Sequence, residues 1–113
     1  MTESAARLLK GTVDVMILKA VSWAPLHGYA ISRWIAQTTG GVFTVQEGAL
    51  YPALRRLEQK GLLESYWAVT ETGREARFYR LTRPGKRLLD RETQEWARYA
   101  DAMSRVLESS KPA

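Results

Sequence analysis

The 113-residue sequence contains no cysteine, so neither a disulfide framework nor a thiolate metal site is available to it. It also lacks a glycine-rich phosphate loop, a nucleophile elbow and any cluster of carboxylates. No apolar run approaches the roughly 18 residues that a membrane span requires, and the first residues lack the apolar core of a signal peptide. These absences argue against an enzyme, a metal or cofactor protein and a membrane protein, and we expect a cytoplasmic chain.

Histidine is almost absent as well. His27 is the only one, and it lies between Leu26 and Gly28, where a helix should begin after the break at Pro25. We therefore interpret His27 as a capping or first-turn residue rather than a catalytic base. An enzymatic function then has no candidate residue in this sequence.

Positive charge is in excess. Seventeen Lys and Arg residues face twelve Asp and Glu residues, for a net charge of +5 at pH 7. This balance favours a polyanionic partner but does not identify one, because small ribosome-associated proteins are equally basic. The length allows one compact domain, and a domain this small needs a partner for any large apolar face left uncovered.

The apolar pattern indicates a particular order of elements. Helical spacing covers residues 8–23, 26–37 and 46–60, and residues 42–45 form a short β-prone stretch. Two aromatic-rich segments, 62–69 and 76–81, flank a loop that contains Gly73 and predict a β-hairpin. Thr82 can cap a last helix over residues 83–107. The order is that of a mainly α (α+β) winged helix-turn-helix, with a DNA-binding domain at 1–82, a dimerisation helix at 83–108 and a disordered tail at 109–113.

The third predicted helix is the candidate for the major groove, which has room for an α-helix. Its apolar stripe leaves an outward face that holds Ala49, Tyr51, Pro52, Arg55 and Arg56. Arginine reads guanine with two hydrogen bonds and also neutralises phosphate, whereas Pro52 is expected to fall in the first turns, where proline is tolerated. The alternative interpretation is a solvated helix face, since Glu58 and Gln59 follow directly.

The predicted hairpin supplies two further cationic residues. We expect Arg74 and Arg77 to lie near phosphates or in the minor groove, although Glu71 and Glu75 offset their charge.

The last helix carries a seam that predicts a homodimer. Its members recur at steps of three and four, with one polar residue among them: Leu89, Glu92, Trp96, Tyr99, Met103 and Val106. Each large apolar side chain that such a seam buries contributes roughly 1.5–3 kcal/mol. The first helix has a second stripe of apolar or small residues, at Leu8, Gly11, Val15 and Leu18, and we expect this stripe to meet the last helix of the partner.

Five segments together resemble the signature of PadR-like transcriptional regulators: LKGT at 9–12, PLHGY at 25–29, EGALYPAL at 47–54, RLE at 56–58 and YRLT at 79–82. The resemblance spans about residues 8–106. It implies a winged helix, a homodimer, and repression through a palindromic operator in double-stranded DNA. The family usually has Ser or Thr where this chain has Ala49, so a hydroxyl contact is lost there.

The chain resembles the short subfamily, in which a single C-terminal helix makes the dimer. That resemblance implies a small aromatic or lipophilic effector near the dimer interface. We expect its pocket to be lined by Val15, Leu18, Trp96, Ala100 and Met103, with paired indoles around a flat guest. The alternative for Trp96 is plain interface core. For the whole chain, the alternatives are a winged helix used only for protein contacts, and an enzyme.

Overall fold

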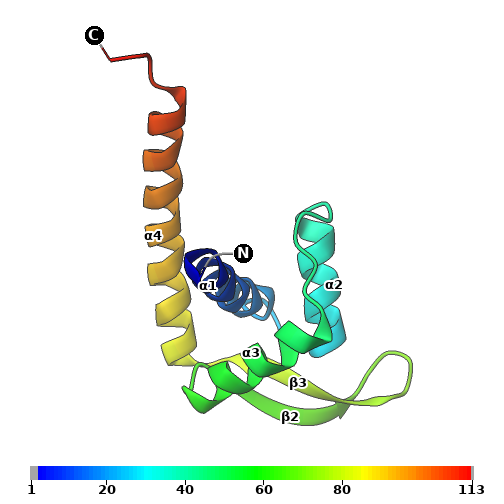
Figure 1. Ribbon diagram of the computed structural model, residues 1–113. Helices are drawn as coiled ribbons and strands as arrows, with labels where there is room; N and C mark the ends of the chain where they lie inside the picture. Colours follow the sequence, from blue (N-terminus) through cyan, green and yellow to red (C-terminus); the bar gives the residue numbers. More distant parts are fainter. Residues whose placement is uncertain (1–2, 113) are drawn as a thin grey trace.

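The computed structural model describes the backbone of residues 3–112 and the side chains of residues 12–112. Within that part of the chain, four helices and three strands follow one another (Figure 1): α1 (Glu3–Ala20), β1 (Leu26–His27), α2 (Gly28–Thr38), α3 (Glu47–Gln59), β2 (Leu63–Val69), β3 (Glu75–Leu81) and α4 (Arg83–Glu108). The predicted class, a winged helix with a long C-terminal helix, is confirmed. No helix in the described residues is long and apolar enough to cross a membrane.

The strands form one antiparallel sheet in the order β1-β3-β2. Strands β2 and β3 make the predicted hairpin, in which Leu63 pairs with Leu81 and Val69 with Glu75. The loop between them, residues 70–74, contains Gly73 at a φ of 82°, a backbone conformation that glycine adopts without steric cost. We call β2, this loop and β3 the wing.

The expected strand at residues 42–45 was wrong, and the third strand is β1 instead. Leu26 and His27 pair with Tyr79 and Phe78, so β1 takes the edge of β3 that β2 leaves open. Residues 42–45 form no strand, and their backbone groups bond instead to side chains of α2 and of its cap, Thr39. The Phe43 N–H donates to Thr39 Oγ1 at 3.1 Å, and the Val45 carbonyl accepts from Ser32 Oγ at 2.6 Å. An extended segment becomes a strand only where a second strand offers partners.

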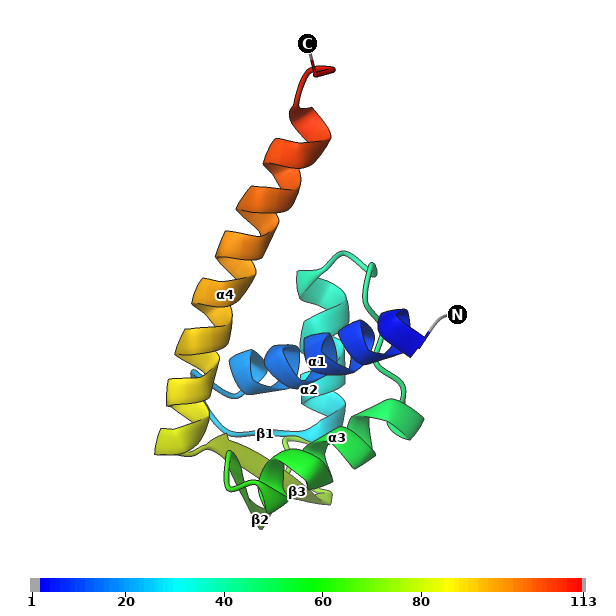
Figure 2. The same ribbon diagram turned by 60° about the vertical axis from the view of Figure 1, so that its left-hand side comes forward.

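Helix α1 lies at the centre of the molecule. In Figure 1 it lies between α4 and α2, with α3 beneath it; Figure 2 shows it crossing in front of α2, again above α3. Its side chains Ile17 and Leu18 are both fully buried, because α2, α3 and α4 of the same chain pack around it. The expectation that Leu18 faces a partner or an open pocket was therefore wrong. Val15 is half-buried, and the predicted interface side chain of Leu8 lies outside the described residues.

Helix α4 begins inside the domain and then leaves it. The Thr82 hydroxyl caps it as predicted, accepting from the Gly85 N–H at 3.1 Å. Gly85 packs so closely against Leu62 that a Cβ would overlap the Leu62 carbonyl oxygen. Leu89 is also buried in the core. Farther along, the helix extends away from the other elements (Figures 1 and 2), which makes the molecule 64 Å long and 26–28 Å across.

Candidate nucleic-acid interface

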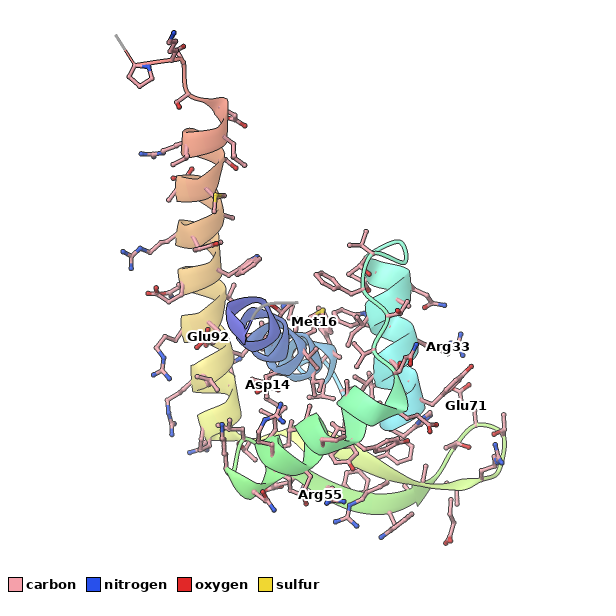
Figure 3. All side chains as sticks on the ribbon, in the orientation of Figure 1. Asp14, Met16, Arg33, Arg55, Glu71 and Glu92 are labelled. Atoms are coloured by element: carbon pink, nitrogen blue, oxygen red, sulfur yellow. The ribbon has the colours of Figure 1, made fainter. Side chains whose placement is uncertain are left out.

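Helix α3 is anchored along one side and exposed along the other. Its buried residues are Leu50, Ala53, Leu54 and Leu57, at helical steps of three, one and three. They pack into the core with α1 and α2. Ala49, Tyr51, Pro52 and Arg55 are all exposed on the remaining surface. Figure 3 shows Arg55 on the side of α3 away from α1, where a long cationic side chain can reach a partner.

Tyr51 is held in place by the start of α2. A Cβ added at Gly28 would lie 3.1 Å from the Tyr51 hydroxyl oxygen and 3.2 Å from a ring carbon, so the ring rests directly on this glycine. The same helix start is capped by His27, whose Nδ1 accepts from the Ala30 N–H at 3.3 Å. The capping interpretation of His27 is confirmed, and the cap orients the surface against which Tyr51 packs.

Pro52 lies deeper in the helix than expected. Because α3 begins at Glu47, Pro52 is its sixth residue, beyond the first turn. It has no N–H to donate to the Gly48 carbonyl four residues earlier. The first-turn explanation for its tolerance was therefore wrong. Pro52 is exposed, so water can reach this side of the helix.

Arg56 does not lie on the exposed side of α3. Its Nη2 donates to Oδ1 of Asp14 in α1 at 2.6 Å, and the two side chains are only 26% and 21% exposed. Its Nε is buried, without a hydrogen-bond partner among the described residues. The expectation that Arg56 shares an outward face with Arg55 was wrong. Adjacent helix positions are separated by about 100°, so Arg55 points away from the domain while Arg56 points toward α1.

Arg77 of the wing is tied to α3. Its Nε donates to Ser65 Oγ at 2.8 Å, and its Nη2 lies 3.6 Å from Glu58 Oε2. Ser65 in turn donates to the same Glu58 oxygen at 2.5 Å. The guanidinium also lies over the ring of Trp67, 5.7 Å from its centroid. These contacts connect the wing to the C-terminal half of α3 and fix their relative positions.

Tyr79 marks the point where these groups converge. Burial raises the pKa of its phenol above the ordinary value of 10.0, while the positive charge of Arg77 acts in the opposite direction. Glu58, Tyr51 and Arg55 act on the same phenol more weakly. Tyr79 lies opposite Ser65 in the ladder, and the Ser65 hydroxyl donates to Glu58 of α3, so the base of the wing adjoins the C-terminal half of α3.

The wing carries an exposed tryptophan that the sequence interpretation missed. Trp67 is 65% exposed, and it lies opposite Arg77 in the ladder. The available signal was strict alternation along β2. Leu63 is buried, so Ser65 and Trp67 share its face of the strand. Arg74 lies in the exposed loop at the wing tip, as expected from the hairpin.

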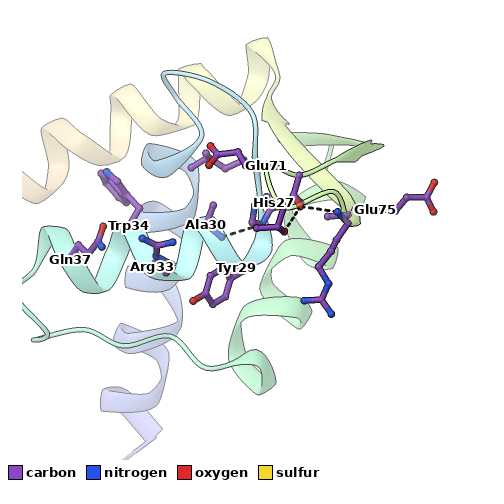
Figure 4. A pocket seen from close by; sticks show the side chains of 13 residues that line it. His27, Tyr29, Ala30, Arg33, Trp34, Gln37, Glu71 and Glu75 are labelled. Atoms are coloured by element: carbon purple, nitrogen blue, oxygen red, sulfur yellow. Dashed lines mark hydrogen bonds between the residues drawn. The ribbon is translucent and has the colours of Figure 1, made fainter.

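A groove of about 790 Å³ separates the wing tip from α2 (Figure 4). Its walls combine cationic, acidic and aromatic side chains, among them Arg33, Arg74, Glu71 and Tyr29. None of the expected effector residues lines this groove. Trp96 is 55% exposed on α4 and stacks on Tyr99, with ring centroids 5.6 Å apart. A pocket around Trp96 therefore requires a second copy of the chain.

The helix-turn-helix formed by α2 and α3, followed by the wing, defines a winged-helix protein. Residues 17–91 match the sequence model of the transcriptional regulator PadR-like family. The chain belongs to this family, whose members are transcriptional regulators and not enzymes.

Similar proteins extend this match over most of the chain. An uncharacterized protein of Lysinibacillus sphaericus is 31% identical over 101 residues, which are 89% of this chain and 93% of that protein. The structure of a transcriptional regulator from Clostridium thermocellum has a TM-score of 0.77 and 29% identity, covering 88% of this chain and 96% of that one. A PadR family transcription regulator from Clostridium difficile has a TM-score of 0.73 and 30% identity, covering 84% and 97%.

Proposed function

We propose that this regulator is a homodimeric repressor that binds a palindromic operator in duplex DNA and is released by a flat aromatic or lipophilic effector. The observation that carries the proposal is the surface formed by α3 and the wing. Tyr51 and Arg55 are exposed on α3, and Arg77 is anchored to the same helix through Glu58. In this proposal α3 enters the major groove, Arg55 contacts bases or phosphates, and Arg74 at the wing tip contacts phosphates.

Arg77 has a different part in this proposal from Arg55. Its guanidinium already contacts Ser65, Glu58 and Trp67, so it orients the wing and adds positive charge near the DNA. Arg56 is left out, because its charge is paired with Asp14. The proposed contacts to DNA are Ala49, Tyr51, Pro52 and Arg55 from α3 and Arg74 from the wing.

The projecting half of α4 supports the homodimer. Four exposed apolar residues, Trp96, Tyr99, Met103 and Val106, form what we call the apolar seam. They follow heptad-like steps of three and four, which present one stripe to a second helix. Leu89, the first residue of the predicted seam, is buried in its own domain. The proposed interface therefore begins near Glu92 rather than at Leu89.

Salt-dependent DNA binding tests the operator proposal. Sequences selected from random duplex DNA supply the ligand, and fluorescence anisotropy measures Kd as salt is raised. Arg55→Ala should weaken binding by about 1–3 kcal/mol if the guanidinium reads a base, or lower the salt slope by about one if it contacts a phosphate. Arg98→Ala is the matched control, because Arg98 is an exposed arginine on α4. Wild-type protein that shows no salt-dependent binding would favour a winged helix used only for protein contacts.

The dimer proposal is tested separately on the full chain. Met103→Glu places a charge in the apolar seam and should shift the sedimentation coefficient toward that of a monomer. Ser104→Glu adds the same charge one position along α4, at an exposed residue outside the seam, and should leave a dimer. Dimers of equal stability in both variants would contradict the proposed interface.

The effector proposal rests on the same seam. Two copies of the Trp96–Tyr99 stack, brought together across a twofold axis, offer parallel aromatic surfaces to a planar guest. Planar dyes should quench the tryptophan fluorescence of the dimer and lower its operator affinity. Trp96→Ala should lose this response. Trp23→Ala, which removes an exposed indole near α1, should retain it. Equal dye affinity in both variants would place the effector elsewhere.

A further inference from the structure

Strand β2 begins in the core and ends in solvent, so the side chains along one of its faces change from buried to exposed. Leu63 is buried, and Ser65 lies next on that face, bonded to Glu58 of α3. Trp67 and Val69 follow at alternate positions, 65% and 62% exposed. Alternation places all four side chains on the α3 side of the sheet. The wing thus extends beyond α3 with an apolar surface on the same side as the proposed DNA contacts.

The Trp67 indole has one cationic neighbour, the side chain of Arg77. Arg77 lies opposite it in the ladder, with its guanidinium over the ring. That guanidinium is itself fixed by Ser65 and Glu58. A tryptophan has only two rotatable side-chain bonds, so little conformational entropy is lost when it enters a binding site. The arrangement presents an exposed aromatic plate next to the guanidinium of Arg77.

The charge around this plate favours DNA as its occupant. Arg77 contacts the indole directly and shares its charge with Glu58, whereas Arg55, exposed on α3, has no ion-pair partner among the described residues. An apolar side chain among cations suits a nucleic-acid groove, where phosphates meet the cations and the base steps meet the ring. Apolar wedges from proteins enter the minor groove most readily at pyrimidine–purine steps, because these steps unstack most easily.

We propose that Trp67 is a specificity-determining residue: its indole wedges into the minor groove beside each half-site and selects deformable base steps there, with Arg77 as the residue that positions it. This inference rests on the proposed operator binding. In this inference the protein distinguishes DNA sequences by how easily a base step deforms, without a hydrogen bond to a base. The preference arises from the cost of deforming the step beneath the wing.

The test compares operators that differ only at the step beneath the wing, TA against AA, in anisotropy titrations with the full-length protein. Wild type should prefer TA, and Trp67→Ala should raise Kd for the TA operator about tenfold and abolish the preference. Its salt slope should stay unchanged, because the indole carries no charge. Trp67→Phe should restore part of the preference. Trp23→Ala, which removes an indole of similar exposure in the loop before β1, should behave as wild type.

A second measurement follows the DNA itself. With 2-aminopurine in place of adenine at the TA step, wild type should raise the fluorescence as the base unstacks, and Trp67→Ala should not. If Trp67→Ala keeps wild-type affinity, step preference and fluorescence change, the inference is wrong while operator binding stands. If wild type itself binds no DNA in a salt-dependent way, the proposed function fails first.

Discussion

The ion pair between Asp14 and Arg56 should contribute measurably to stability, unlike the exposed ion pairs of this chain. It joins α1 to α3 through a charged hydrogen bond of 2.6 Å, with both side chains about three-quarters buried. A hydrogen bond between charged groups contributes about 1.5–3 kcal/mol. Residual exposure and the cost of desolvation reduce that value. We expect a coupling free energy of about 1–2 kcal/mol between the two side chains.

The assay is a double-mutant cycle in urea. Unfolding free energies are measured for the wild type, Asp14→Ala, Arg56→Ala and the double variant, all at one protein concentration because the proposed dimerisation would couple to stability. The matched control is the pair of Arg80 and Glu64, with a similar distance of 2.9 Å but side chains 58% and 57% exposed. Such an exposed pair should couple by about 0.2–1 kcal/mol, at the lower end in high salt.

Two outcomes would refute this reasoning. One is a coupling for Asp14 and Arg56 no larger than that of the exposed pair. The other is a loss of operator affinity in Arg56→Ala, with unchanged fold and stability, which would mean that Arg56 leaves Asp14 to contact DNA. The expected result is a destabilised Arg56→Ala variant whose folded fraction still binds DNA with the salt slope of the wild type.

Three further predictions concern the glycines and Tyr79. Gly85→Ala should lower the free energy of urea unfolding by about 1–3 kcal/mol, because the added Cβ overlaps backbone. Gly48→Ala, with nothing within 4 Å of its Cβ, should raise the free energy of unfolding by about 0.5–1 kcal/mol. If both variants change this free energy in the same direction, the packing described for Gly85 is contradicted. Gly28→Ala should displace Tyr51 and raise the operator Kd about fivefold without unfolding the chain, as checked by circular dichroism. Because burial raises the pKa of Tyr79, the unfolded state ionises first. Stability should therefore fall as pH rises above 10.0, and Tyr79→Phe should flatten that fall in urea titrations.

Local chemistry carried much of the sequence interpretation. The cap at Thr82 depends on a hydroxyl and an N–H three residues apart, and the cap at His27 has the same spacing. The hairpin depends on two β-prone segments around Gly73. These groups lie close together in sequence, so their pattern can be recognised without the tertiary structure. The buried stripe of α3 from Leu50 to Leu57 could also be predicted, because its residues recur with the period of a helix.

The sequence predictions were wrong where two faces of one helix contact different neighbours. Arg55 and Arg56 are chemically identical, but Asp14 lies 42 positions before Arg56 in the chain. Periodicity separates the faces of a helix but does not say which neighbour covers each face. The prediction for Leu18 was wrong for this reason. The sequence of α1 is apolar on two sides, and we assigned one side to a partner, whereas α2, α3 and α4 of the same chain cover both.

The sequence by itself therefore determined the order of the four helices, the caps at His27 and Thr82, the hairpin and the excess of positive charge, because neighbours along the chain specify each of these. Only the tertiary structure decided that β1 rather than residues 42–45 completes the sheet, that Arg56 pairs with Asp14, and that Trp67 lies on the α3 side of the wing. Each of these depends on the contact of segments distant in sequence. Such contacts are selected by the free energy of the whole packed domain, which no local pattern encodes.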